Sequence, residues 1–307
     1  MTVMDAIAVQ AGFDAWCRDE LARVERALAE WIAADAPAGL GDPMRYAVLD
    51  GGKRLRPLLV LAAAQSAGEP SAPSREASLR AGCAVELIHA YSLVHDDMPC
   101  MDNDVLRRGK PTVHVQFGEA RALLAGDALQ ALAFELLTPE HLQIPDALQA
   151  RLCRQLALAA GYNGMAGGQA IDLASVGKQL TQAQLQQMHR LKTGALLQAS
   201  VEMGAACAGI HGAAFDALRR YGASLGLAFQ VIDDVLDVVA DSATLGKTAG
   251  KDAASDKPTY VSLMGLDAAR AYANELLAEA QAALAESGLP SVQHLSALAD
   301  MVVRRSH

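Results

Sequence analysis

The sequence predicts an all-α protein, and three observations lead to this prediction. Hydrophobic residues make up 52% of the 307 residues, enough for a large core, whereas aromatic residues make up only 4%. Alanine, leucine and glutamine recur throughout, and these residues lose little conformational freedom in a helix. Apolar residues repeat with helical spacing, as in Leu21, Val24, Ala27, Leu28 and Trp31, whereas no segment alternates convincingly as a strand does.

Short loops divide the chain into these helices. Clusters of glycine, proline and polar residues predict breaks at 67–74, 138–146 and 287–291. Ordinary helix and loop lengths then give an estimate of about ten helices. No tandem repeat or linker is evident, so we expect residues 1–307 to form a single domain.

Charge and cysteine content narrow the class of protein. A formal net charge of -9 argues against bulk binding of nucleic acid or of an anionic membrane. The five cysteines are odd in number and none has CxxC spacing, which favours a reduced, cytoplasmic protein over a disulfide framework or a zinc site. Neither a signal peptide nor a membrane span is expected, since residues 1–10 lack a basic region and the longest uncharged runs contain Gly, Gln and Asn.

Two segments, 83–98 and 225–239, are apolar nearly all round and are expected to be buried central helices. Each carries a pair of aspartates near its C-terminal end. The C-terminal end of a helix is already partly negative, so two adjacent carboxylates are unfavourable there unless a cation is present. The pattern therefore indicates a cation site at the end of each helix.

The first acidic motif contains Asp96, Asp97 and Asp102. Pro99 disfavours a helical conformation for Met98, so we expect the helix to stop there and the chain to loop back and present Asp102.

The second acidic motif contains Asp233, Asp234 and Asp237. Asp233 and Asp237 are four residues apart and share one helix face. Ligands that are all oxygen atoms suit a hard cation, and Mg²⁺ typically takes one or two carboxylates and completes its shell with water and substrate phosphate. Such a metal neutralises a departing diphosphate.

Basic residues stand where a phosphate would need them. The segment 51–57 (GGKRLRP) precedes an apolar helix with Pro57 in its first turn, so its cations lie beside a positive helix end. The segment 106–111 (LRRGKP) follows the first acidic motif, and arginine is a good bidentate phosphate ligand. His89 lies two helical turns before Asp96 on the same face. The segment 164–169 together with Asp172 indicates close helix packing with polar groups turned inward.

These motifs together resemble the short-chain trans-isoprenyl diphosphate synthase family, and within it most nearly the bacterial members that make farnesyl diphosphate. The matching stretches are GGKRLRP (51–57), the segment from ELIHAYS to KPTVH (86–114), GMAGGQAIDL (164–173), HRLKTGALL (189–197) and GLAFQVIDDVLDVVADSATLGK (226–247).

The resemblance implies an orthogonal helix bundle around a deep central cavity, usually in a homodimer. It implies an enzyme that joins dimethylallyl or geranyl diphosphate to isopentenyl diphosphate, through ionisation, condensation and elimination, to give (E,E)-farnesyl diphosphate. Three Mg²⁺ ions are implied. The cavity must exclude water, since water would quench the allylic cation.

The resemblance also implies a role for each candidate site residue. The metal ligands would be Asp96, Asp97, Asp102, Asp233 and Asp237. The ligands of isopentenyl diphosphate would be Lys53, Arg56, His89 and Arg108. The ligands of the allylic diphosphate would be Arg107, Lys192, Lys247 and Lys257. Thr193 and Gln230 would line the nascent cation, and Lys192, Thr193 and Gln230 would form the catalytic set.

Tyr91 is the residue expected to limit the product length. It lies five residues before Asp96, about 7.5 Å deeper along the same helix at 1.5 Å per residue. In the resembled family an aromatic residue at this position accompanies short products. The alternative is that Tyr91 simply fills the core.

Other activities remain open on the sequence alone. A geranylgeranyl or longer-chain synthase is the main alternative. A class I terpene cyclase has no need of Lys53, Arg56 and His89, and a non-catalytic synthase subunit should have lost an acidic motif. The role of the C-terminal residues 304–307 is left open between a lid and a disordered tail.

Overall fold

The computed structural model of the chain describes residues 3–49, 51–239 and 258–305, and its secondary structure is helical apart from one small pair of strands. In chain order the elements are α1 (Val3–Trp31), the 3₁₀ turn η1 (Pro37–Gly39), α2 (Gly41–Val48), α3 (Leu55–Gln65), α4 (Ala72–Asp96), β1 (Leu106–Arg107), β2 (Lys110–Pro111), α5 (Val113–Phe117), α6 (Glu119–Leu137), α7 (Asp146–Ala160), α8 (Met165–Ala174), α9 (Gln182–His189), the π-helical turn η2 (Arg190–Gly194), α10 (Ala195–Cys207), α11 (Gly212–Val239), α14 (Tyr260–Met264), α15 (Leu266–Glu286) and α16 (Gln293–Val303).

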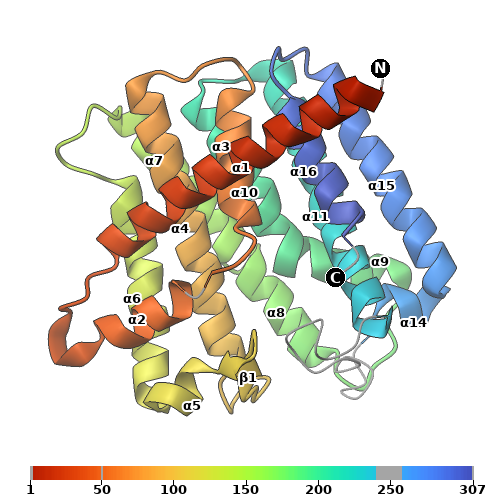
Figure 1. Cartoon of the computed structure of the whole chain (residues 1–307). Coiled ribbons are helices and arrows are strands. Elements are labelled where there is room, and N and C mark those ends of the chain that lie inside the picture. The colour runs from red at the N-terminus through yellow and green to blue at the C-terminus, as the bar shows by residue number, and fades with distance from the viewer. Residues whose placement is uncertain (1–2, 50, 240–257, 306–307) are drawn as a thin grey trace.

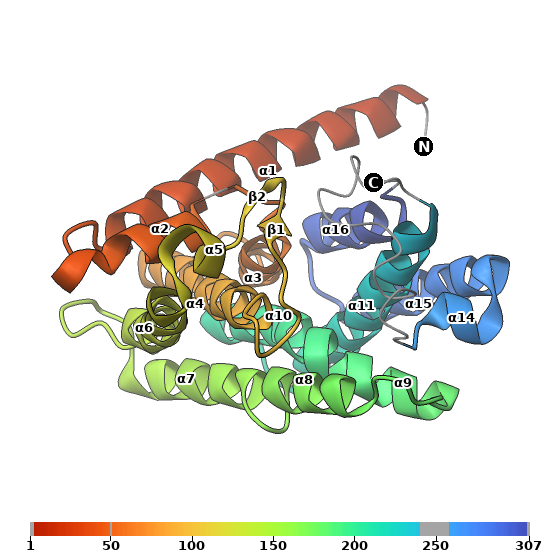
Figure 2. The ribbon, with the colours of Figure 1, turned by 90° about the horizontal axis from the view of Figure 1, so that it is seen from below.

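The helices are stacked in layers that cross one another. Helix α1 runs diagonally over the others (Figure 1). In Figure 2, α1 and α2 lie on one side and α7, α8 and α9 form a row on the opposite side, with α3, α4 and α10 between them. Helix α4 packs along α6, and α11 packs along α15. The buried helices α4 and α10 therefore have neighbours on several sides.

Helix α10 joins two hydrophobic clusters. Leu196 and Met203 belong to a cluster with α4, α6 and α7. Leu197 and Val201 belong to a second cluster with α3, α11, α15 and α16. Adjacent positions of a helix point in different directions, so one helix buries side chains in both clusters. All four of these side chains are completely buried.

The predicted all-α class is confirmed, and the loops fall where the glycine and proline clusters place them: α3 ends at Gln65 before α4 begins at Ala72, and α6 ends at Leu137 before α7 begins at Asp146. The helices in the described ranges exceed the estimate of about ten, since α5, α8, α9 and α14 are only five to ten residues long. Across these ranges no helix combines the length and the hydrophobicity that a membrane crossing requires.

Candidate active site

The first acidic motif closes the C-terminal end of α4. The helix ends at Asp96, and the chain returns to it because the backbone N–H of Asp102 donates to the carbonyl oxygen of Asp96 at 2.8 Å. The loop predicted after Pro99 therefore brings these two aspartates together. Burial raises the pKa of Asp96 to about 6, against the opposing effect of Lys192. A bound cation would stabilise the ionised form of such a carboxylate.

Asp97 is held by the small hairpin that follows. Its carboxylate is 2% exposed and accepts two hydrogen bonds from Arg107, from Nε at 2.8 Å and from Nη2 at 2.6 Å. The strands β1 and β2 are joined by Arg108 and Gly109, whose φ angles of 51° and 76° are those of a tight type I′ turn. Arg108 Nη1 donates to the carbonyl oxygen of Gly51 at 2.6 Å, which ties the hairpin to the glycine-rich loop.

The basic residues of the segment before α3 differ in their contacts: Arg54 is ion-paired with glutamates, whereas Lys53 and Arg56 are candidates for binding substrate. Arg54 has a left-handed backbone conformation (φ 43°), and its 2% exposed side chain forms ion pairs with Glu25 at 2.7 Å and with Glu86 at 2.8 Å. Arg54 lines the larger cavity described below together with Lys53 and Arg56, but its guanidinium is already held by the two glutamates. Of these two arginines, the sequence assigned only Arg56 to substrate, and that assignment stays a prediction.

The second acidic motif is connected to the π-helical turn by hydrogen bonds. Asp234 accepts from the side-chain nitrogen of Gln230 at 2.9 Å and from the backbone N–H of Tyr260 at 2.8 Å. Thr193 donates its hydroxyl hydrogen to Gln230 Oε1 at 3.0 Å. Two residues expected to line the nascent cation, Thr193 and Gln230, are therefore in direct contact. Asp233 is more accessible, with its side chain 40% exposed.

Close packing of small residues positions Lys192 and Thr193. A Cβ atom on Gly168 of α8 would lie 2.1 Å from the backbone nitrogen of Lys192, so only glycine fits there. Lys192 Nζ forms an ion pair with the buried Asp172 at 2.5 Å. These contacts agree with the close packing and inward polar groups expected for residues 164–172. Single π-helical turns within α-helices are frequent at functional sites.

Two cavities meet at α4, and both are lined by Arg56 and His89. The smaller, of about 360 Å³, is also lined by Tyr91, Asp96, Lys192 and Thr193. The larger, of about 720 Å³, is also lined by Lys53, Arg108 and Asp233. The structure thus places nine predicted site residues around one pair of adjoining cavities, within the size range of small-molecule sites. Burial, and then the charge of Arg56, lower the pKa of His89 well below its usual value, so this imidazole is neutral.

Two residues that line the cavities, Arg305 and Gln169, were not assigned to the site from the sequence. Arg305 lines the larger cavity, donates to the carbonyl oxygen of Phe229 at 2.9 Å and pairs with Asp233 Oδ1 at 3.3 Å. Its guanidinium lies 4.1 Å from the centre of the Phe229 ring. Gln169 lines the smaller cavity, and its buried amide atoms have no hydrogen-bond partner in the described chain. The signals available were a basic C-terminal segment and a polar residue in a glycine-rich segment.

The carboxylates fit magnesium ions that are completed by a substrate. Among the described residues, no group of three or more His, Cys, Asp and Glu side chains is arranged to hold a metal alone. Mg²⁺ needs only one or two carboxylates when phosphate oxygens and water supply its other ligands. In the first motif, burial disfavours the ionised form of Asp96, which a cation would stabilise. In the second motif, Asp237 is 5% exposed and lies one helical turn beyond Asp233. The predicted phosphate ligands Lys247 and Lys257 lie outside the described residues.

Comparison with known proteins agrees with this arrangement. The profile of the polyprenyl synthetase family matches residues 37–289. A probable farnesyl diphosphate synthase of Bradyrhizobium diazoefficiens is 52% identical over 289 residues, which cover 92% of this chain and 85% of that protein. The farnesyl diphosphate synthase of Escherichia coli is 48% identical over 269 residues, with 86% and 89% covered.

A solved structure is similar over nearly its whole length. The Helicobacter pylori geranyltransferase, crystallised with magnesium and isoprenyl diphosphate, superposes with a TM-score of 0.84 at 35% identity and covers 95% of this chain and 97% of that one. The chain belongs to the polyprenyl synthetase family, and the family resemblance drawn from its motifs is confirmed.

Proposed function

We propose that this protein is a farnesyl diphosphate synthase, which joins dimethylallyl or geranyl diphosphate to isopentenyl diphosphate. The observation that carries the proposal is the pair of adjoining cavities, each with an aspartate of one acidic motif and a set of cations, that share Arg56 and His89. A reaction between two diphosphates needs two anion sites side by side. The two bacterial relatives described above, a probable farnesyl diphosphate synthase at 52% identity and a farnesyl diphosphate synthase at 48%, support this assignment.

The smaller cavity is assigned to the allylic substrate. Asp96 and Lys192 line its polar end, and Asp102 lies next to Asp96. Met101, Met165 and Leu173 are among the apolar side chains that line it. The hydrocarbon tail lies among these apolar side chains and the diphosphate lies at the aspartates. Arg107 donates hydrogen bonds to Asp97 and so lies at the same end of α4.

The larger cavity is assigned to isopentenyl diphosphate, since Lys53, Arg56, His89 and Arg108 line it. Neutral His89 donates a hydrogen bond without adding charge between the guanidinium groups.

Bound Mg²⁺ would supply Lewis-acid stabilisation of the leaving diphosphate. The chain's own residues do the rest. Lys192 places a positive charge beside Asp96. Thr193 donates to Gln230, whose side-chain nitrogen donates to Asp234, so these polar groups connect the π-helical turn to the second acidic motif. After condensation a proton is lost, and the released diphosphate accepts it, because no side chain in the cavities is an obvious base. The apolar cavity wall excludes water from the allylic cation.

Further features belong to the same proposal. We assign three Mg²⁺ ions, with Asp97 assisting the first motif and Asp237 supporting Asp233. Lys247 and Lys257 are assigned to the allylic diphosphate. The protein is proposed to be a cytoplasmic homodimer formed by one domain over residues 1–307; the exposed Leu123 and Leu124 on α6 support a covered face there.

A product assay with isotopically labelled isopentenyl diphosphate tests the proposal. With dimethylallyl diphosphate and Mg²⁺ we expect a fifteen-carbon diphosphate as the main product, and no turnover in EDTA. Asp96→Ala and Asp233→Ala should each lower turnover by orders of magnitude, whereas the exposed Asp216→Ala on α11 serves as the control. A main product of twenty carbons would contradict the farnesyl assignment, and undiminished turnover in EDTA would contradict the role of the metal.

A further inference from the structure

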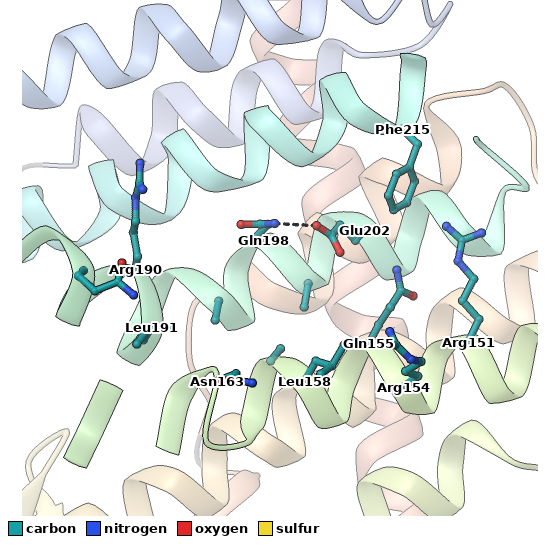
Figure 3. Close-up of a pocket in the computed structure, with 14 residues that line it drawn as sticks. Arg151, Arg154, Gln155, Leu158, Asn163, Arg190, Leu191, Gln198, Glu202 and Phe215 are labelled. Carbon is teal, nitrogen blue, oxygen red and sulfur yellow. Dashed lines mark hydrogen bonds between the residues drawn. The ribbon is translucent and has the colours of Figure 1, made fainter. Parts of the chain in front are cut away.

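A groove on another face of the molecule shares no lining residue with the two active-site cavities. It runs between α7, α10 and the start of α11, ends at the π-helical turn, and has a volume of about 580 Å³ (Figure 3). Arg190 and Leu191 of that turn line the groove, whereas the next two residues, Lys192 and Thr193, line the allylic cavity. The groove is therefore separated from the active site by one turn of helix.

Three arginines give this groove a positive character in a protein of net charge -9. Arg151 and Arg154 project from α7 and Arg190 from the π-helical turn, and none of the three has an ion-pair partner in the described part of the chain. Arg151 stacks on Phe215, with 4.9 Å between its guanidinium carbon and the ring centre. Arg219, one turn after Phe215 on α11, by contrast pairs with Asp216 at 3.0 Å. Arg151 and Arg154 lie together at one end of the groove and favour an anionic ligand there, whereas Arg190 lies at the other end (Figure 3).

The other polar groups of the groove do not neutralise these arginines. Glu202 is the one acidic side chain among the described lining residues, and its carboxylate already accepts a hydrogen bond from Gln198 at 2.7 Å. Gln155 also lines the groove and follows Arg154 directly on α7. Its buried side-chain oxygen has no hydrogen-bond partner in the described chain. This oxygen is an acceptor, so it can take a hydrogen bond from water or from an arginine but not bind the oxygens of an anion.

Apolar side chains form the rest of the groove. Leu158 and Ala159 of α7 line it together with Leu191, Ala195 and Ala199, and Leu158 remains 48% exposed. A large exposed apolar side chain beside grouped arginines matches a ligand with an anionic head and a hydrocarbon tail.

We propose that this groove is a second binding site, for an isoprenoid diphosphate, with the diphosphate held by Arg151 and Arg154 and the hydrocarbon chain laid along Leu158 and Leu191. Such a site goes beyond the proposed reaction. It requires no metal, because guanidinium groups replace the ion that the acidic active site needs.

Calorimetric titration of the full chain with farnesyl diphosphate in EDTA tests the proposal. We expect one site per chain, whose affinity falls as salt is raised. Arg151→Gln with Arg154→Gln should raise the dissociation constant about tenfold or more, since each substitution removes a charge-assisted hydrogen bond. Inorganic diphosphate and farnesol should each bind at least about tenfold more weakly than farnesyl diphosphate, because each lacks one half of the ligand.

Matched variants distinguish binding in this groove from binding in the active site and from a subunit interface. Arg219→Gln, on the exposed surface of α11, should leave the affinity unchanged. The proposal is overturned if no binding occurs in EDTA, if the double arginine variant binds as well as the wild type, or if Lys53→Gln with Arg56→Gln abolishes the binding instead. It is also overturned if the double variant loses its oligomeric state in light scattering along with binding, since the groove would then be a subunit interface. Each outcome is independent of the product assay.

Discussion

The ring of Tyr91 is held in place by neighbouring side chains of α4 and α6. The ring packs edge-on against His95 with 5.7 Å between ring centres, and its hydroxyl lies near Gln130 of α6. His95 in turn packs on Gly126, where a Cβ atom would lie 2.1 Å from the imidazole. A half-buried phenol held in this way between α4 and α6 forms a rigid wall of the allylic cavity.

Replacement of Tyr91 by alanine should lengthen the product. The Tyr91→Ala variant opens the wall toward α6, so we expect chains of twenty carbons or more by chromatography of the dephosphorylated products. The cavity should cost roughly 2–4 kcal/mol of unfolding free energy, measured by denaturant titration. Tyr91→Phe keeps the ring and loses only the hydroxyl contact, so it should still make fifteen carbons. An active Tyr91→Ala enzyme that stops at fifteen carbons would show that another side chain limits the length.

The role of a single site residue could be predicted only where its residue type and local pattern point to one kind of ligand. Aspartate pairs at the ends of apolar helices predict a cation, and both pairs do lie at cavities or at their supporting contacts. The pairing of Asp97 with Arg107 depends on a tight turn at Arg108 and Gly109, and no pattern in the sequence was read as that turn. Arg305 lies beside Asp233 through tertiary packing of α16, which no local pattern indicates.

At the scale of elements, the π-helical turn is packed between α8 and α11, and α9, which leads into it, contacts α14. Just before the turn, His189 is 6% exposed and stacks on Tyr260 of α14 with 5.5 Å between ring centres. Neither ring nitrogen has a hydrogen-bond partner in the described chain. Burial lowers the pKa of His189 to about 4, although Asp172 acts in the opposite direction. The junction of α9 with the turn is therefore built around a neutral imidazole.

This junction should make the protein sensitive to acid. His189 has a pKa near 6.5 when unfolded and about 4 when folded, so the unfolded chain binds a proton first as the pH falls through this window. Stability is then lost on acidification, by roughly 3 kcal/mol at most from this residue. In His189→Phe the ring stacking remains and this loss disappears, so denaturant titrations at pH 7 and pH 4 should differ less than in the wild type.

A control for this measurement is His141→Gln, since His141 is exposed in the loop after α6. The stability of the His141→Gln variant should depend on pH in the same way as that of the wild type. If the His189→Phe variant loses as much stability on acidification as the wild type, the imidazole is not the group responsible.

Elements were predictable where hydrophobic periodicity and turn residues agree. The loop near residue 70 and the end of α4 lie where glycine and proline place them. The short helices and the π-helical turn were not predictable, since segments of five to ten residues carry too few positions for a period. The turn depends on Gly168 and Gly226, which approach it from α8 and α11 and are distant in sequence.

At the scale of the whole molecule, the active site lies where the two hydrophobic clusters meet. The helix that ends in Asp96 packs in the first cluster, and the helix that carries Asp233 packs in the second. Composition and period predict both helices, but they contain no information on how the two clusters are oriented. The convergence of the acidic motifs could be expected only from the family resemblance, and the family comparison confirms that fold.

A ligand that bridges the two halves should therefore stabilise the whole molecule. When Mg²⁺ is added to protein that already contains inorganic diphosphate, we expect the melting temperature to rise further by about 5 to 11 °C. Saturation at about 100 times the dissociation constant contributes about 2.7 kcal/mol, and about 2–4 °C accompanies each kcal/mol in a protein of this size class.

Asp96→Ala and Asp233→Ala should each remove more than about half of this rise in scanning calorimetry, because each removes a ligand from one half. Asp216→Ala, whose carboxylate pairs only with the exposed Arg219 among the described residues, should keep the full rise. If both aspartate variants keep it as well, the metal and diphosphate bind away from the two acidic motifs. If only one variant loses it, a single half of the molecule binds the ion and no bridge forms.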